Sequence, residues 1–283
     1  MKFMRTKKSR LIFLGTGAAF ATECYNASFV IERPDGELFM TDTGGGNGII
    51  RQMKHAGLDF KRLHYIFVTH GHSDHILGSV WIVRRIARLM IKGKYDGELH
   101  IYGHDASCYI MRTLAELLMQ RAELAELGHR IHFHVMEDGE TVKLLDMQLT
   151  AFDIRSTKTK QFAYRLRFAP RRALVCLGDE PYNRRCHKYV EGADWLISEA
   201  FCAFDDRAQF DPYAKSHATT KEAAEAAEEI GAKHLVLYHT EDTDLANRKE
   251  KYTRDAKKYF SGDVRVPDDL EVIELIRNDI DVG

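Results

Sequence analysis

Three imidazoles and one carboxylate lie within six consecutive residues of the chain: His70, His72, Asp74 and His75. An apolar run, Tyr65–Thr69, leads directly into them and reads as a buried strand. His70 and His72 are two positions apart, so an extended chain aims both rings at one ion, while Asp74 and His75 are free to hold a second. Imidazole and carboxylate ligands suit Zn²⁺, and also Mn²⁺ or Fe. We therefore expect a metal site at the carboxyl end of a strand.

The surrounding sequence predicts the elements that position this cluster. Short β-branched and aromatic runs predict strands at Arg10–Leu14, Ser28–Ile31, Leu38–Thr41, Tyr65–Thr69, Glu98–Tyr102, Thr150–Asp153, Ala163–Phe168, Ala173–Leu177, Trp195–Ser198, Leu235–Tyr238 and Leu270–Leu275. Helical patterns occur at Asn47–His55, Ile76–Ile91, Ser107–Leu127, Thr220–Ile230 and Leu245–Tyr259. In each half of the chain strands come before helices rather than alternating with them. This order favours two mixed β-sheets packed together, with the helices outside.

The composition is that of an ordinary globular protein. No repeat or Pro/Ser-rich linker divides the 283 residues, so we expect one domain over residues 1–283. The net charge of -1 argues against bulk electrostatic capture of nucleic acid or of an anionic membrane. None of the five cysteines forms a CxxC pair, which fits reduced thiols and a cytoplasmic location. No apolar run approaches the ~18 residues that a membrane span needs.

The run His70–His75 resembles the signature of the metallo-β-lactamase superfamily, HxHxDH after a strand. Further motifs resemble the ribonuclease Z-like branch in the same order: Leu14-Gly15-Thr16-Gly17, Asp42-Thr43-Gly44-Gly45-Gly46, Gly178-Asp179, Glu199-Ala200-Phe201, His217-Ala218-Thr219 and Leu237-Tyr238-His239. The resemblance spans most of the chain. It implies an α/β (α+β) fold, namely a four-layer αβ/βα sandwich of two mixed β-sheets with outer helices.

The same resemblance implies a role for each matching residue. It assigns His70 and His72 to metal 1, Asp74, His75 and His239 to metal 2, and Asp179 to a bridge between the two ions. Zinc is the expected metal at both positions, with manganese or iron as alternatives. His217, backed by Glu199, is the implied general acid for the leaving oxygen, and Asp74 joins them as a catalytic residue.

One position departs from the family pattern. The family supplies a third histidine to metal 1, but the segment Asp153–Arg165 contains none, and the slot falls near Arg155 or Thr157. A guanidinium cannot ligate a cation and repels one, so we expect metal 1 to be weak, absent or completed by water. Arg155 is expected instead to bind an anionic substrate group such as a phosphate. A substitute ligand from the pair His132 and His134 is the less favoured alternative.

These observations predict a metal-dependent hydrolase, a phosphodiesterase that uses a metal-activated hydroxide. Ribonuclease Z carries an inserted Gly-rich basic arm for tRNA, whereas here residues 169–172 lead straight into the next strand. A small-molecule or nucleotide-like phosphodiester is therefore the expected substrate, with RNA less favoured. The alternatives are a carboxylic ester, lactone or thioester hydrolase on the same fold, and a catalytically degenerate, metal-poor binding scaffold. The resemblance also implies a homodimer.

Overall fold

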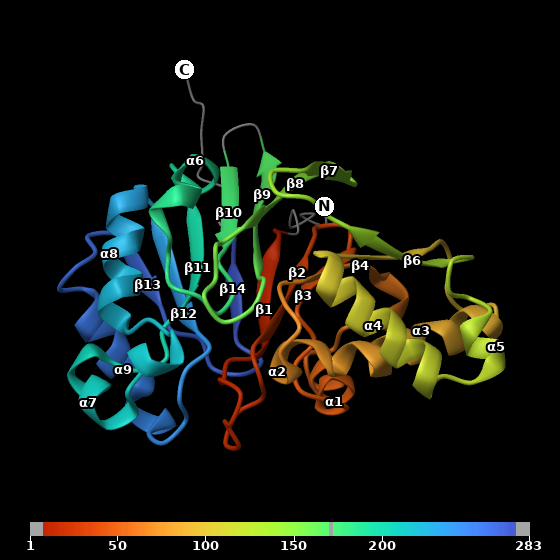
Figure 1. Ribbon diagram of the computed structural model, residues 1–283, viewed down its shortest axis with the longest axis horizontal. Coiled ribbons are helices and arrows are strands. Elements are labelled where there is room, and N and C mark those ends of the chain that lie inside the picture. The colour runs from red at the N-terminus through yellow and green to blue at the C-terminus, as the bar shows by residue number, and fades with distance from the viewer. Residues whose placement is uncertain (1–7, 170–171, 276–283) are drawn as a thin grey trace, which may run out of the picture.

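The strands of the computed structural model, which describes residues 8–169 and 172–275, form two mixed sheets (Figure 1). The first sheet has the order β14 (Val272–Glu274), β1 (Arg10–Gly15), β2 (Ser28–Glu32), β3 (Leu38–Thr41), β4 (Leu63–Val68), β5 (Leu99–Gly103) and β6 (Ile131–Val135). The second has the order β13 (Asp263–Arg265), β12 (His234–Tyr238), β11 (Trp195–Glu199), β10 (Arg172–Cys176), β9 (Phe162–Ala169), β8 (Met147–Asp153) and β7 (Thr141–Leu144).

Helices flank each sheet on the side away from the other sheet (Figure 1). The first half of the chain contributes α1 (Gly48–His55), η1 (Phe60–Arg62), α2 (Ser73–Ile76), α3 (Gly78–Ile91), α4 (Asp105–Leu118) and α5 (Arg121–Leu124). The second half contributes η2 (Arg184–Cys186), α6 (His187–Val190), η3 (Phe204–Asp206), α7 (Arg207–Phe210), η4 (Tyr213–Lys215), α8 (Thr220–Ile230) and α9 (Leu245–Ala256). In the part of the chain that the structure describes, no helix is long and apolar enough to cross a bilayer.

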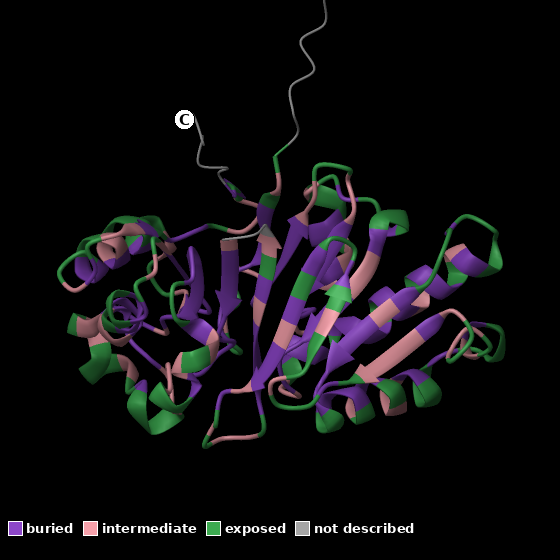
Figure 2. Ribbon diagram, turned by 90° about the horizontal axis from the view of Figure 1, so that it is seen from above, coloured by how far each residue is buried: buried purple, intermediate pink, exposed green. Residues whose placement is uncertain are grey.

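Three apolar clusters hold the layers together. The aromatic rings of Phe29, Phe67, Tyr164 and Tyr238 are buried in the cluster between the two sheets. A second cluster joins the first sheet to α1, α3 and α4, and a third joins the second sheet to α8 and α9. Figure 2 shows the strands mostly buried and the exposed residues concentrated on outer helices and loops. The expected four-layer sandwich is confirmed.

Parallel runs of strands in both sheets decide where the functional groups meet. Strands β3 to β6 run parallel in the first sheet, and β10 to β13 run parallel in the second. The segment after β4 is tied across the sheets to the start of β9, because the Phe162 N–H donates to the Thr69 carbonyl at 2.9 Å. The carboxyl ends of β4 in one sheet and of β10 and β12 in the other therefore face a common space.

The predicted helix over Ser107–Leu127 is wrong in its length. The helix ends at Leu118, because Met119 has an extended backbone with φ -91° and ψ 155°. The short helix α5 follows and begins with a capping box between Gln120 and Glu123. The Glu123 carboxylate is buried and accepts from Arg84 at 3.1 Å and from Arg88 at 2.6 Å. These two ion pairs join α5 to α3.

The predicted helix over Ile76–Ile91 begins at Gly78 instead, because Ile76 ends the short helix α2, and this glycine supports the metal loop. The Gly78 N–H donates to the Gly44 carbonyl at 2.9 Å, and the position of a Cβ at Gly78 lies only 1.9 Å from the Thr43 carbonyl oxygen. Thr43 in turn bonds the His75 carbonyl through its N–H and its hydroxyl, both at 2.8 Å. Close packing at Gly78 thus places the start of α3 beside the His75 backbone.

We predict that Gly78→Ala destabilises the protein by about 1–3 kcal/mol, since the added methyl group has no room against the Thr43 carbonyl. The free energy of unfolding from urea titration measures the effect. Gly46→Ala is the matched control, because no atom lies within 4 Å of a Cβ at Gly46. Equal stability of the two variants would contradict the packing argument.

Candidate metal centre

Five of the six predicted ligands converge from both sheets on one buried space, and the sixth, His72, is partly exposed and belongs to none of the ligand groups below. His70 and His72 follow β4, Asp74 and His75 lie in α2, Asp179 follows β10, and His239 follows β12. These side chains and His217 form three groups, and within each group the ligand atoms lie within 4.8 Å of one another. The groups are His70, His75 and Asp179; Asp74, His75 and His239; and Asp179, His217 and His239. The structure therefore brings together residues that are more than one hundred positions apart in the sequence.

The first set of donors surrounds the Asp74 carboxylate. Asp74 Oδ2 lies 3.3 Å from His75 Nε2 and 3.3 Å from His239 Nε2. All three side chains are buried. Burial would raise the pKa of Asp74, but the His75 and His239 rings outweigh it and keep the pKa below its usual value. Asp74 is thus held as a carboxylate, the form that ligates a cation.

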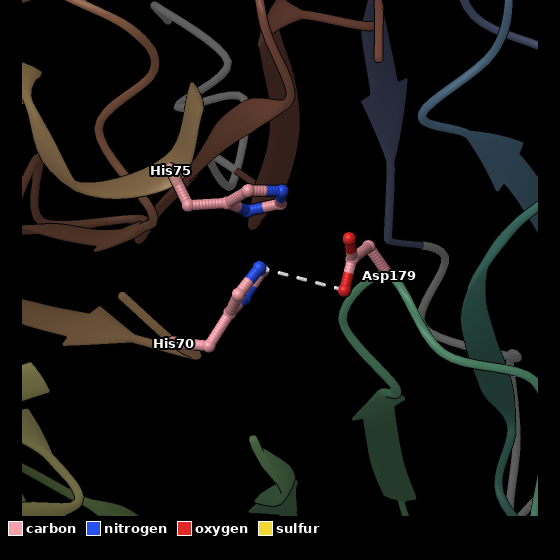
Figure 3. A group of neighbouring side chains, drawn as sticks. All are labelled: His70, His75 and Asp179. Carbon is pink, nitrogen blue, oxygen red and sulfur yellow. Dashed lines mark ion pairs between the residues drawn. The ribbon is translucent and has the colours of Figure 1, made fainter. Parts of the chain in front are cut away.

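The second set of donors surrounds Asp179. Figure 3 shows His70 and His75 projecting from the first sheet toward the Asp179 carboxylate, which comes from the second. His70 Nε2 lies 3.5 Å from Asp179 Oδ1, and His72 Nδ1 lies 4.0 Å from Asp179 Oδ2. Burial lowers the pKa of His70 well below its usual value, so the ring is neutral and offers a lone pair.

The separations of the His70 and His75 rings from the carboxylates fit a shared cation better than direct hydrogen bonds. Among the described residues, His70 Nε2 and Asp179 Oδ1 are buried without a hydrogen-bond partner. Two ligands about 2.0 Å from a tetrahedral ion are about 3.3 Å apart, whereas an N–H···O bond is shorter, at about 2.9 Å. Buried polar atoms without partners are costly unless an ion or water completes them. The donor set therefore fits a divalent metal ion.

Asp42 and Thr69 orient the imidazoles and were not predicted as site residues. Asp42 Oδ2 lies 2.7 Å from His75 Nδ1, and the same carboxylate accepts from the Thr69 N–H at 2.8 Å. The Thr69 hydroxyl lies 2.9 Å from His70 Nδ1. Partners of this kind leave the opposite nitrogen, Nε2, aimed at the metal position. The sequence signal for Asp42 was its place directly after a strand, in the Asp-Thr-Gly motif.

Asp42 also controls the charge of His75. Burial would lower the pKa of His75, but the Asp42 and Asp74 carboxylates outweigh it and raise the pKa well above its usual value. A bound proton on His75 Nε2 competes with a metal ion for the same lone pair. Asp42 therefore has two effects on the ligand: it fixes the ring, and it makes the ring more basic.

His217 and Glu199 form a buried pair at the edge of the centre. His217 Nδ1 lies 2.5 Å from Glu199 Oε2, and the other oxygen of Glu199 accepts from the Ala218 N–H at 2.8 Å. Burial raises the pKa of Glu199 well above its usual value, and the Asp179 carboxylate adds to this. Burial, and next the Lys158 ammonium, lower the pKa of His217 to about 4. The pair therefore carries no net charge at neutral pH.

Lys158 reaches the centre, and Arg155 does not. The Arg155 guanidinium pairs with Asp138 at 2.6 Å and with Asp153 at 3.0 Å on the surface, which corrects its expected place beside the substrate. The physical reason is a turn: Arg155 has a left-handed backbone with φ 64°, and its N–H donates to the Asp153 carboxylate. Lys158 Nζ lies 3.3 Å from Asp179 Oδ2 instead.

The other candidates for the third ligand also lie elsewhere. The Thr157 hydroxyl contacts the Ser216 hydroxyl at 3.4 Å. His132 and His134 lie on β6, where His134 Nε2 is 3.0 Å from His100 Nδ1 and His132 Nε2 is 3.2 Å from Glu98. Neither histidine belongs to the groups of ligand atoms found in the described residues. The structure thus offers no third imidazole for metal 1 from these positions.

Comparisons with known proteins agree with this architecture. The model of the family described as "Anti-Pycsar protein Apyc1" matches residues 9–259. The ribonuclease Z of Thermococcus gammatolerans is 28% identical, over 96% of this chain and 94% of its own length. The metallo-β-lactamase fold protein YhfI from Bacillus subtilis superposes with a TM-score of 0.78 at 20% identity, covering 94% of this chain and 99% of that one. A diphosphatase from the PhnP family has a TM-score of 0.73 at 19% identity, covering 95% and 98%.

We predict that Asp42→Asn weakens Zn²⁺ binding about 10- to 100-fold, because the amide no longer fixes and polarises the His75 ring. Competition with a chelating dye measures the dissociation constant. Asp146→Asn is the matched control, since Asp146 is exposed and pairs only with Arg33 in the described residues. Unchanged affinity in Asp42→Asn would show that His75 is not a ligand.

Proposed function

This chain belongs to the family described as anti-Pycsar protein Apyc1, and we propose that it cleaves a phosphodiester of nucleotide-like size at the centre around Asp179. It is a metal-dependent hydrolase of the metallo-β-lactamase superfamily, similar to ribonuclease Z. One observation supports the proposed chemistry above the others. Buried imidazoles and carboxylates from both sheets face one another at 3.3 to 3.5 Å, with atoms that lack hydrogen-bond partners.

The residues that hold the metal follow from the donor geometry. We assign Asp74, His75 and His239 to one ion, with Asp179 beside them, and His70 and His72 to the position next to it. We propose zinc, which favours mixed imidazole and carboxylate ligands. A bound divalent ion supplies a Lewis acid that lowers the pKa of water and offsets the negative charge of the phosphoryl group in the transition state.

His217 is proposed to protonate the leaving oxygen. Its Nδ1 is hydrogen-bonded to Glu199 at 2.5 Å, so Nε2 is the nitrogen that can donate a proton to the leaving oxygen. As the Nε2 proton moves to the leaving oxygen, Nδ1 takes the proton of the Glu199 carboxyl, and Glu199 ends as a carboxylate. Because the pKa of Glu199 is raised, this carboxyl still holds its proton at neutral pH and can supply it. The pKa of His217 is too low for the imidazole to carry an extra proton of its own at that pH.

The connection between β9 and β10 supports a small substrate. The two strands are joined by residues 170 and 171, which lie outside the described residues, so no long arm is inserted there. RNA is the second candidate, because the curated relatives include ribonuclease Z. The homodimer implied by the family resemblance stays a prediction.

The alternative functions have less support. A metal-poor scaffold is not favoured, because the donor atoms that such a scaffold would lose are present and buried. A carboxylic ester, lactone or thioester hydrolase is not favoured either, since relatives and structural neighbours include a ribonuclease and a diphosphatase.

We predict that the purified protein hydrolyses bis-p-nitrophenyl phosphate, that a chelator abolishes this turnover, and that Zn²⁺ restores it. Asp179→Ala should reduce turnover to background, because the carboxylate faces both sets of ligands. Absorbance of p-nitrophenol measures the rate, and Asp146→Ala is the control. Turnover that survives in Asp179→Ala, or turnover of p-nitrophenyl acetate alone, would contradict the proposal.

Substrate size is tested with two natural-type phosphodiesters. We expect cleavage of a dinucleotide at a rate well above that of a structured precursor tRNA, with products followed by chromatography. Faster cleavage of the precursor tRNA would favour the second candidate.

We predict that His217→Ala slows esters with poor alcohol leaving groups by about 10²- to 10⁴-fold, because general acid catalysis is lost. Esters of p-nitrophenol should lose far less, since that leaving group needs no proton. Rates across a series of leaving groups measure the difference. His187→Ala is the matched control, because His187 is partly exposed beside Tyr182. A uniform loss across the series would contradict the acid role.

A further inference from the structure

Lys158 brings an ammonium group to the carboxylate that faces both sets of ligands. Its Nζ lies 3.3 Å from Asp179 Oδ2, 3.0 Å from the Asp179 carbonyl oxygen and 3.7 Å from Glu180 Oε1. The side chain is mostly buried, at 17% exposure. An ammonium is a compact positive charge with three donors, and the three oxygens near it here all belong to Asp179 and Glu180.

The backbone around Lys158 is held so that the side chain points into the centre. The Ser156 hydroxyl donates to Glu180 at 2.5 Å and accepts from the Lys158 N–H at 3.1 Å. Gln161 Nε2 lies 3.4 Å from the same oxygen of Glu180. Glu180 therefore anchors both ends of the segment Ser156–Gln161 to the loop that carries Asp179. These hydrogen bonds fix the position of the Lys158 ammonium.

The two metal positions differ in what this ammonium does to them. The set of Asp74, His75 and His239 has three donors grouped within 4.8 Å, without any need for Asp179 Oδ2. The neighbouring position is lined by His70, His75 and Asp179, so an ion there depends on the carboxylate that Lys158 already contacts. His72 is the exposed member of the cluster, at 41%. A second divalent ion there would have to share His75 with the first ion and would meet the like charge of the ammonium.

From this difference we propose that the centre holds one divalent ion, at Asp74, His75 and His239, and that Lys158 takes the place of the second. The inference rests on the proposed function and gives it a specific metal content. The ammonium lies 3.3 Å from the Asp179 carboxylate and offsets its negative charge, as a second ion would. Lys158 is in this sense a positioning residue for Asp179.

Metal counting tests the inference with Zn²⁺ alone as the probe. The full-length protein is saturated with Zn²⁺, dialysed and measured by elemental analysis, with the dissociation constant from calorimetry. We expect one ion per chain in the native protein. Lys158→His, which supplies an imidazole and removes the charge, is expected to bind two.

Lys158→Met separates the effect of the charge from that of a new ligand. It should still bind one ion, but about tenfold more tightly, because the repulsion between the ammonium and the ion is gone. Lys160→Met is the matched control and should leave the binding unchanged, since Lys160 pairs with the exposed Asp105. Thermal unfolding checks that each variant is folded. If Lys158→His does not fold, Lys158→Met still decides.

The outcomes separate the two proposals. Two ions in the native protein would overturn the role of Lys158 and leave the metal-dependent function standing. No bound ion, together with no phosphodiester turnover, would overturn the proposed function and this inference with it. Zinc affinity that is unchanged in Lys158→Met would show that the ammonium only fills space.

Discussion

The burial of charge at the junction of the two sheets is the constraint on which the rest of the structure depends. The Asp74 and Asp179 carboxylates are almost fully buried, and a buried charge is tolerated only when other groups compensate it. Here the compensation comes from imidazoles that the parallel strands of both sheets deliver at their carboxyl ends. A divalent ion completes the balance, so metal binding and the packing of the two halves belong to one equilibrium.

Much of this arrangement could be predicted from the sequence because the signals are local. The cluster from His70 to His75 combines ligand types with a strand before it, and the apolar runs of both sheets gave the four layers. Asp179, Glu199, His217 and His239 were placed by motif order, and the structure brings all four to the centre.

The direction in which some side chains point, and the place where one helix ends, could not be predicted from the sequence. Arg155 stands at the expected slot, but a left-handed turn sends its guanidinium to the surface, while Lys158, three residues later, reaches Asp179. The helix break at Met119 was hidden because the apolar pattern continues through it, and only the capping box at Gln120 marks a new start. In both cases backbone geometry decided where a familiar residue type points.

Because the donors come from distant parts of the chain, the centre also has an order of assembly. The cluster near residue 70 leaves the ribosome long before β12 and His239 are made. A nascent first half can offer imidazoles to a metal ion, but not the carboxylate of Asp179 or the ring that completes the set with Asp74 and His75. The set of Asp74, His75 and His239 is therefore complete only once β12 has been made and has joined the second sheet.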